Sequence, residues 1–237
     1  MKLSIVIPVY NEQERITKTL STVLNYMKRN FYNFNVIVVD DGSKDNTFKI
    51  LQEFSNIYKE IVLLSNKQNL GKGAAVRNGV LNADADYIYF TDADLSTPIE
   101  EIKNFINVMN EENCDIVIGS RAVKKSKILV HQPVYRELMG KIFNKLVKLL
   151  LMKDFNDTQC GAKLFRGAVA KKVFSLSKIN GFAFDVEVLY IAKLYGYRIK
   201  EIPIVWRHFG KSKVHPLFSS IEMFRDLFKI KFNNYKT

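Results

Sequence analysis

The stretch Val36-Ile-Val-Val-Asp-Asp-Gly-Ser43 decides how the first half of the chain is expected to fold. Four consecutive β-branched residues are typical of a strand buried on both faces of a parallel sheet, and the acidic and glycine residues after them are typical of a turn. Similar apolar runs lie at residues 3–9, 61–64, 87–90 and 116–118, with helical periodicity beginning between them near residues 12, 44, 72 and 98. This alternation predicts an α/β protein with an open, mostly parallel twisted sheet flanked by helices.

Length and composition fit one folded domain. Of 237 residues, 47% are hydrophobic and 25% are charged, and the two cysteines, Cys114 and Cys160, favour neither a disulfide scaffold nor a structural zinc site. No apolar run approaches the roughly 18 to 20 residues of a membrane span. We therefore expect a cytoplasmic protein, soluble or peripheral, with a domain at 1–215, divided into halves 1–120 and 121–215, and a basic amphipathic helix at 216–237.

Charge is distributed unevenly along the chain. Residues 1–115 carry 12 Lys and Arg against 16 Asp and Glu, whereas residues 116–237 carry 24 against 8, so the two parts have net charges of −4 and +16. A nucleic acid, an anionic membrane surface or a phosphorylated substrate would each attract such lysines, and a solvated surface is the simpler alternative. Composition alone does not choose between them.

Two amphipathic segments lie in the basic part. One runs from Pro133 to Met152, and the other is close to the C-terminus. Their apolar stripes are formed by Leu138, Ile142, Leu146 and Leu149, and by Leu217, Ile221, Phe224 and Phe228. Lysines and arginines flank both stripes. Either helix could lie in a membrane interface, or its stripe could simply cover the sheet.

Acidic residues follow two of the predicted strands, where ligands bind in open parallel sheets. Asp40 and Asp41 are suited to the hydroxyls of a ribose or the imide nitrogen of a pyrimidine, although an ordinary turn would have the same residues. Asp92 and Asp94 can converge on one point and would repel each other unless a hard divalent cation lay between them. A helix cap is the alternative for Asp94. Such a cation would also bridge a diphosphate.

A glycine-rich turn, Gly71-Lys-Gly73, opens the next predicted helix. Backbone N–H groups and the ammonium of Lys72 could meet a phosphate there. The turn is not a Walker loop, and it lacks the third glycine of a dinucleotide fingerprint.

Taken in order, these motifs resemble family 2 glycosyltransferases with a GT-A fold. The resemblance rests on Pro8-Val-Tyr-Asn-Glu12, Asp40-Asp-Gly-Ser43, Gly71-Lys-Gly73, Asp92-Ala-Asp-Leu-Ser96 and Gly119-Ser-Arg121. Three further segments resemble the dolichyl-phosphate β-glucosyltransferases and related polyprenyl-phosphate sugar transferases: Asp157-Thr-Gln-Cys-Gly161, Gly181-Phe-Ala-Phe-Asp-Val-Glu187 and Pro203-Ile-Val-Trp206 leading to Lys211-Ser-Lys213. The match spans nearly the whole chain.

The resemblance implies roles for particular residues. The uridine would be held by Pro8, Tyr10, Glu12 and Asp41, and the nucleotide or its phosphates would be approached by Lys72 and Arg77. The metal and diphosphate motif corresponds to Asp92, Ala93 and Asp94, the lipid-phosphate site to Arg121 and Arg136, and the loop that closes on the donor to Ser212 and Lys213. Mg²⁺ or Mn²⁺ would be the cofactor. Ser96 stands where related mannosyltransferases have a Gln metal ligand, so the third ligand is open.

The implied reaction is inverting transfer of a hexose, most simply glucose, from a UDP-sugar to a polyprenyl phosphate of the dolichyl type. The metal and Lys213 would stabilise the leaving diphosphate. Because the second pKa of a phosphate monoester is about 6, the attacking oxygen is already largely ionised and needs no strong base. We therefore expect Asp185 and Glu187 to position the sugar or acceptor, with base-like roles, or a structural one for Glu187, as alternatives.

Several alternatives stay open at this stage. GDP-mannose could be the donor, a glycan hydroxyl could be the acceptor, and a basic non-enzymatic membrane or nucleic-acid binder would share the charge. A nucleotidyltransferase would be expected to carry a glycine-rich loop where this chain has Pro8 to Glu12. His208 is either a metal or phosphate ligand or a structural residue. The sequence lacks the N-terminal anchor usual in eukaryotic glucosyltransferases, so we expect peripheral attachment on the cytosolic face of a membrane.

Overall fold

The computed structural model describes residues 1–210 and 216–235, with the side chains of 216–220 excepted. Its central sheet has the strand order β3-β2-β1-β4-β7-β5-β8. The strands are β1 (Leu3–Val9), β2 (Phe34–Asp40), β3 (Ile61–Ser65), β4 (Tyr87–Thr91), β5 (Ile116–Ser120), β7 (Ala162–Arg166) and β8 (Ile199–Pro203). A separate parallel pair joins β6 (Lys127–Val130) to β9 (Val205–Arg207). The five strands predicted in the first 120 residues are all present.

Most strand pairs in the sheet are parallel, as predicted, and β7 is the exception. It runs antiparallel between β4 and β5, with Phe90 opposite Lys163 and Val117 opposite Leu164. No local pattern in the sequence predicted this strand. Its insertion brings the turn that precedes Ala162 to the carboxyl end of β4.

The side chains of the central strands alternate between the two faces of the sheet, which gives the sheet two apolar cores. Leu3, Ile5 and Ile7 of β1 pack into one core, and Val6 packs into the other. The first core is covered by α1 (Ile16–Asn30), α2 (Thr47–Ile57) and, after the short helix η1 (Ile99–Glu101), α4 (Ile102–Glu111). The second is covered by α3 (Lys72–Asn82), α5 (Val134–Leu150), α6 (Gly167–Leu176), α7 (Phe184–Leu194) and α8 (Pro216–Phe232).

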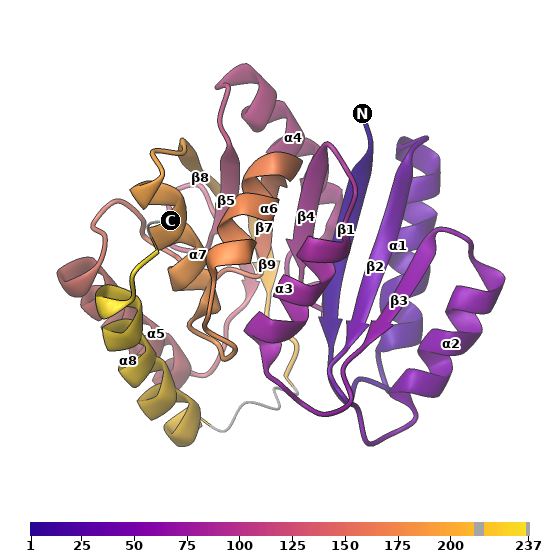
Figure 1. Cartoon of the computed structure of the whole chain (residues 1–237), viewed down its shortest axis with the longest axis horizontal. Helices are drawn as coiled ribbons and strands as arrows, with labels where there is room; N and C mark the ends of the chain where they lie inside the picture. Colours follow the sequence, from indigo (N-terminus) through magenta and orange to yellow (C-terminus); the bar gives the residue numbers. More distant parts are fainter. Residues whose placement is uncertain (211–215, 236–237) are drawn as a thin grey trace.

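Helices α5 and α8 pack on each other at one end of the sheet (Figure 1). In α5 the residues that reach the core are Phe143 and Val147, whereas Leu138, Ile142 and Leu149 of the predicted stripe are exposed. In α8 the core residues are Leu227 and Ile230, and the exposed ones are Ile221, Phe224 and Phe228. Among the described members of the two predicted stripes, Leu146 packs against the second core and the others face outward.

Candidate active site

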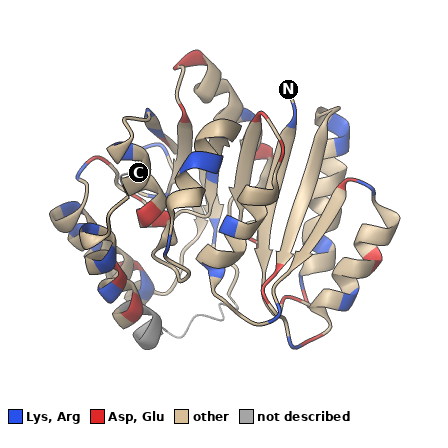
Figure 2. Cartoon of the chain, in the orientation of Figure 1, with Lys and Arg blue, Asp and Glu red and all other residues tan. Residues whose placement is uncertain are grey.

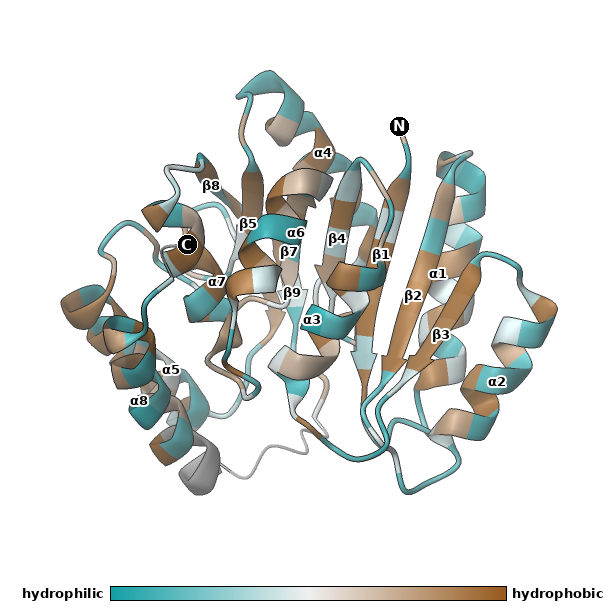
Figure 3. Cartoon of the chain, in the orientation of Figure 1, coloured by the Kyte–Doolittle hydropathy of each residue, from teal (hydrophilic) through white to brown (hydrophobic). Residues whose placement is uncertain are grey.

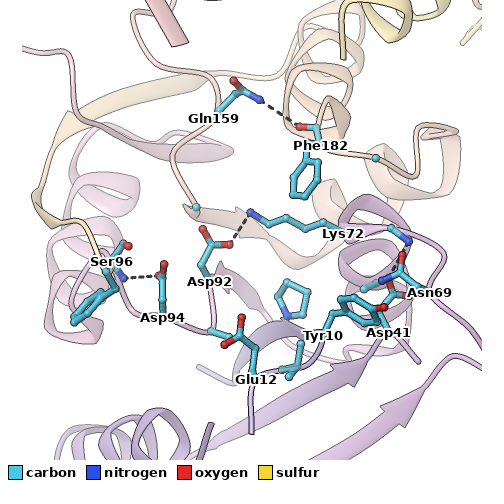
Figure 4. Close-up of a pocket in the computed structure, with 18 of the residues that line it drawn as sticks. Tyr10, Glu12, Asp41, Asn69, Lys72, Asp92, Asp94, Ser96, Gln159 and Phe182 are labelled. Atoms are coloured by element: carbon cyan, nitrogen blue, oxygen red, sulfur yellow. Dashed lines mark hydrogen bonds and ion pairs between the residues drawn. The ribbon is translucent and has the colours of Figure 1, made fainter. Parts of the chain in front are cut away.

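A cleft of about 670 Å³ opens where β1, β2 and β4 end, at the edge where the sequence analysis placed the ligand. Figure 4 shows that its floor carries Asp92, Asp94 and Glu12, with Lys72 reaching across from α3. The sites predicted from separate motifs meet here. The predicted residues that line it are Pro8, Tyr10, Glu12, Asp41, Lys72, Asp92, Ala93, Asp94, Arg121, Arg136 and His208.

The Asp92 carboxylate is held between a cation and a glycine. The Nζ atom of Lys72 lies 2.7 Å from Oδ1 of Asp92. Burial lowers the pKa of Lys72, but the charges of Asp92 and Asp185 outweigh it, so that the pKa is raised and the ammonium stays protonated. On the other side a Cβ at Gly161 would lie 2.0 Å from Oδ2 of Asp92. Only glycine leaves room for this carboxylate.

Asp94 lies in a partly buried position beside Asp92. Its Oδ1 accepts the backbone N–H of Ser96 at 2.8 Å, and the residue between, Leu95, has a positive φ of 49° that turns the chain sharply. Burial, followed by the repulsion of Asp92, raises the pKa of Asp94. A carboxylate pair under such repulsion gains from an added cation.

The two aspartates fit a divalent cation that is shared with a substrate diphosphate. They offer only oxygen donors, which Mg²⁺ prefers, and Mg²⁺ commonly takes one or two carboxylates together with substrate phosphates. Among the described residues, no group of three or more His, Cys, Asp and Glu side chains forms a complete metal cage. His208 lines the cleft with its ring stacked on Trp206, at a centroid distance of 6.1 Å. Its role as a ligand stays a prediction.

The loop after β2 is fixed by Asp41. This buried carboxylate accepts the side-chain amide of Asn66 and the backbone N–H groups of Leu70 and Gly71, at 2.7, 3.0 and 2.8 Å. Asp41 thus orders the glycine turn that carries Lys72. Asp40 is also buried but is not among the residues that line the cleft, and its Oδ2 accepts the N–H of Ser43.

The loop after β1 is joined to the loop after β2. Asn11, with a positive φ of 54°, accepts the N–H of Lys44 through its side chain and donates its own N–H to Ser43. This places Tyr10 and Glu12 in the cleft, where Glu12 pairs with Arg15 at 2.7 Å. Arg15 was not predicted as a site residue.

The basic wall of the cleft is built around Arg121. Its guanidinium forms a bidentate ion pair with Asp157, with Nε–Oδ2 at 2.6 Å and Nη2–Oδ1 at 2.9 Å. The guanidinium also lies over the Trp206 ring. Burial alone would raise the pKa of Asp157, but the charge and hydrogen bonds of Arg121 outweigh it and lower the pKa to about 2. The pair therefore stays ionised and fixes the plane of the guanidinium. Arg136 of α5 lies on the same cleft.

Asp185 and Glu187 are buried outside the residues that line the cleft. Asp185 forms an ion pair with Lys163 of β7 at 2.5 Å, and Lys163 also donates to the carbonyl of Cys160. Burial raises the pKa of Asp185 despite the two nearby lysines. Glu187 accepts hydrogen bonds from backbone N–H groups of the preceding loop. Their predicted catalytic roles stay predictions.

The remaining predicted residues divide into two groups. Arg77 lies outside the residues that line the cleft and donates to the Asn180 side chain at 2.5 Å. Ser212 and Lys213 fall outside the described residues.

Sequence reasoning missed the far wall of the cleft. Gln159, Asn180, Gly181 and Phe182 line it, and Gln159 donates to the Phe182 carbonyl at 3.3 Å (Figure 4). The motifs that contain Gln159, Gly181 and Phe182 were recognised, but no role followed from their residue types. Only the fold brings these segments opposite Asp92.

Comparison with known proteins identifies the family of this chain. Glycosyl transferase family 2 matches residues 4–174. Dolichyl-phosphate beta-glucosyltransferases of Dictyostelium discoideum and Homo sapiens are each 33% identical to this chain over 97% of its length, which covers 74% and 75% of those proteins. The corresponding protein of Saccharomyces cerevisiae is also 33% identical.

Solved structures share the fold. Mannosyl-3-phosphoglycerate synthase from Rubrobacter xylanophilus superposes with a TM-score of 0.74 at 15% identity, over 97% of this chain and 73% of that one. Glucosyl-3-phosphoglycerate synthase from Mycobacterium tuberculosis, in a complex with Mn²⁺, UDP and its product, gives 0.70 at 18% identity, over 97% and 80%. These likenesses concern the GT-A fold. On its sequence match and its fold, the chain belongs to glycosyl transferase family 2 and is a glycosyltransferase.

Proposed function

We propose that this enzyme transfers glucose from UDP-glucose to a dolichyl-type polyprenyl phosphate, with inversion at the anomeric carbon. The observation that carries the proposal is that one cleft holds an acidic pair, Asp92 and Asp94, and a basic wall with Arg121 and Arg136. The acidic pair suits a cation and a diphosphate, and the arginines suit a phosphate monoester. The names of the 33% identical relatives support glucose and dolichyl phosphate, and the UDP in the solved neighbour supports the nucleotide.

The environment of Asp185 favours a phosphate as the acceptor. A sugar or protein hydroxyl would need a general base within reach, and Asp185, for which a base-like role was the alternative, is buried against Lys163. A lipid monophosphate is largely ionised at neutral pH and needs no such base. Arg121, held in place by Asp157, would receive this phosphate and aim one oxygen at the sugar.

The reaction also requires that the negative charge on the leaving diphosphate be stabilised. Asp92 and Asp94 would hold Mg²⁺ or Mn²⁺, which when bound supplies positive charge to the departing phosphate oxygens. Lys72 would add its ammonium from the start of α3. Lys213 is proposed to approach the same oxygens from the segment after β9.

A membrane surface would supply the lipid acceptor. Figures 2 and 3 show basic and hydrophobic residues interleaved along α5 and α8. The most exposed apolar side chains there are Val134, Leu149, Ile221 and Phe232, with exposed fractions of 81%, 76%, 63% and 78%. Lysines on the same helices, such as Lys145 and Lys229, suit anionic headgroups. In the described part of the chain no helix has the length and apolar character of a membrane span. We propose peripheral binding on the cytosolic face.

A donor panel tests the proposal. The full chain is incubated with polyprenyl phosphate in vesicles, with Mg²⁺ or Mn²⁺, and with UDP-glucose, UDP-galactose, UDP-GlcNAc or GDP-mannose in turn. We expect release of nucleoside diphosphate and a β-linked lipid product from UDP-glucose alone, with loss of turnover after chelation of the metal. Turnover with GDP-mannose alone would overturn the donor assignment. Equal turnover with a free glycan in place of the lipid would overturn the acceptor assignment.

Two variants, Asp92→Asn and Arg121→Gln, test the roles of the acidic pair and the basic wall. The first variant should lose metal-dependent UDP binding, and the second should keep UDP binding while the KM for the lipid rises. Normal acceptor kinetics in the Arg121 variant would remove this residue from the phosphate site.

A further inference from the structure

A short connection between α6 and α7 forms the far wall of the cleft. We call residues 177–183 the wall segment. Its carbonyl at Asn180 accepts the backbone N–H groups of Gly73 and Ala74, at 2.7 and 3.3 Å, in the first turn of α3. A Cβ at Gly73 would lie 2.6 Å from the Ile179 carbonyl oxygen, so the two backbones are in close contact. The wall segment, together with Asp41, therefore positions the helix start that carries Lys72.

Glu187 binds the backbone of the wall segment through its carboxylate. This residue of α7 is fully buried, and its carboxylate accepts the N–H groups of Lys178 and Ile179 at 2.8–3.0 Å. Hydrogen bonds of this kind between a carboxylate and a backbone are about twice as strong as neutral ones. The carboxylate thus fixes the segment immediately before Asn180.

A third hydrogen-bond donor to Glu187 is the hydroxyl of Tyr235, 48 residues further along the chain. The hydroxyl of Tyr235 lies 2.8 Å from Oε1 of Glu187, and only 2% of Tyr235 is exposed. Tyr235 follows α8 and is itself held by Tyr195, whose hydroxyl donates to the Tyr235 carbonyl at 2.8 Å. Tyr235 is therefore part of the interior that supports the cleft.

We propose that Glu187 is a positioning residue for donor binding, acting through the wall segment, and that Tyr235 completes its hydrogen bonding. The inference rests on the proposed function, because it takes the nucleotide-sugar to bind against the start of α3. Glu187 touches neither substrate in this scheme. A loosened wall segment would move Asn180 and the α3 turn, and the loss would appear in ground-state binding of the donor and not in the chemical step.

The test uses the full-length enzyme and Tyr235→Phe, which keeps the ring and removes only the hydroxyl. UDP affinity is measured by calorimetry, and KM and kcat for UDP-glucose by product release. We expect the Kd for UDP and the donor KM to rise by about threefold to tenfold, the size of one typical intramolecular hydrogen bond, while kcat changes by less than about twofold. Tyr32→Phe, on a fully exposed tyrosine, is the matched control and should change neither constant.

A second variant separates positioning from general stability. Glu187→Gln should weaken UDP binding in the same direction, and the double variant with Tyr235→Phe should be no weaker than Glu187→Gln alone, because both changes act through one carboxylate. A lower Tm with unchanged Kd and KM in Tyr235→Phe would overturn the inference and leave a purely structural bond. If wild-type enzyme did not bind UDP at all, the proposed function itself would fall, and this inference with it.

Discussion

Replacing Asp157 by Asn removes the counterion of Arg121 inside the protein. The pKa of Asp157 lies at about 2 in the folded chain, against its ordinary value of 3.8. That difference corresponds to roughly 2–3 kcal/mol of folding stability at neutral pH. Because the folded-state pKa is lowered, the contribution is complete above about pH 4 and is lost as the pH falls toward 2.

We expect the free energy of unfolding of Asp157→Asn at pH 7 to be roughly 2–3 kcal/mol below that of the wild type. Its Tm should be lower by roughly 4–12 °C. At pH 3 the difference between variant and wild type should shrink to about half, because protonation has by then removed part of the wild-type advantage. Urea unfolding at the two pH values, followed by circular dichroism with refolding checked, measures both quantities.

Asp154→Asn is the control for this experiment. Asp154 pairs with Lys193, but 53% of its side chain is exposed. An exposed pair is worth little, so this variant should lose less than about 1 kcal/mol. The reasoning would be refuted if Asp157→Asn lost the same free energy at pH 3 as at pH 7, since the loss would then come from packing and not from charge.

Three further variants test the cleft and the membrane face. Gly161→Ala should lower kcat by about a hundredfold, because the new methyl group displaces the Asp92 carboxylate; a folded variant with normal kcat would contradict this. Lys72→Met should weaken UDP binding by about tenfold or more in calorimetry, and unchanged affinity would separate the lysine from the nucleotide. Phe224→Asp combined with Phe228→Asp should abolish co-sedimentation with anionic vesicles while leaving UDP affinity intact, and retained vesicle binding would move the membrane face elsewhere.

Local patterns predicted the first half of this fold well. Val36 to Val39 has an apolar run of the length that a buried strand requires, and Asp41, just after the strand, lines the cleft, as the rule for parallel sheets requires. Asp92 and Arg121, which the family resemblance singled out, also line the cleft. In these cases the signal was contained in a few neighbouring residues.

Contacts between distant segments could not be predicted in this way. Lys163 lies in a strand of mixed polarity, and its complete burial depends on Asp185, which the fold brings to it from α7. The support of the wall segment by Glu187 likewise depends on Tyr235 at the far end of the chain. For α5, periodicity identified an apolar stripe, but in the folded chain it is Phe143 and Val147 that are buried in the core.

The antiparallel strand β7 has a consequence for the synthesis of the protein. Until Ala162–Arg166 has left the ribosome, β4 has one edge without hydrogen-bond partners, next to the strand end that bears Asp92. An open edge invites pairing with other chains. Residues 1–120 therefore do not carry all the partners of β4, and a fragment that ends near residue 120 would leave this edge of the strand unpaired.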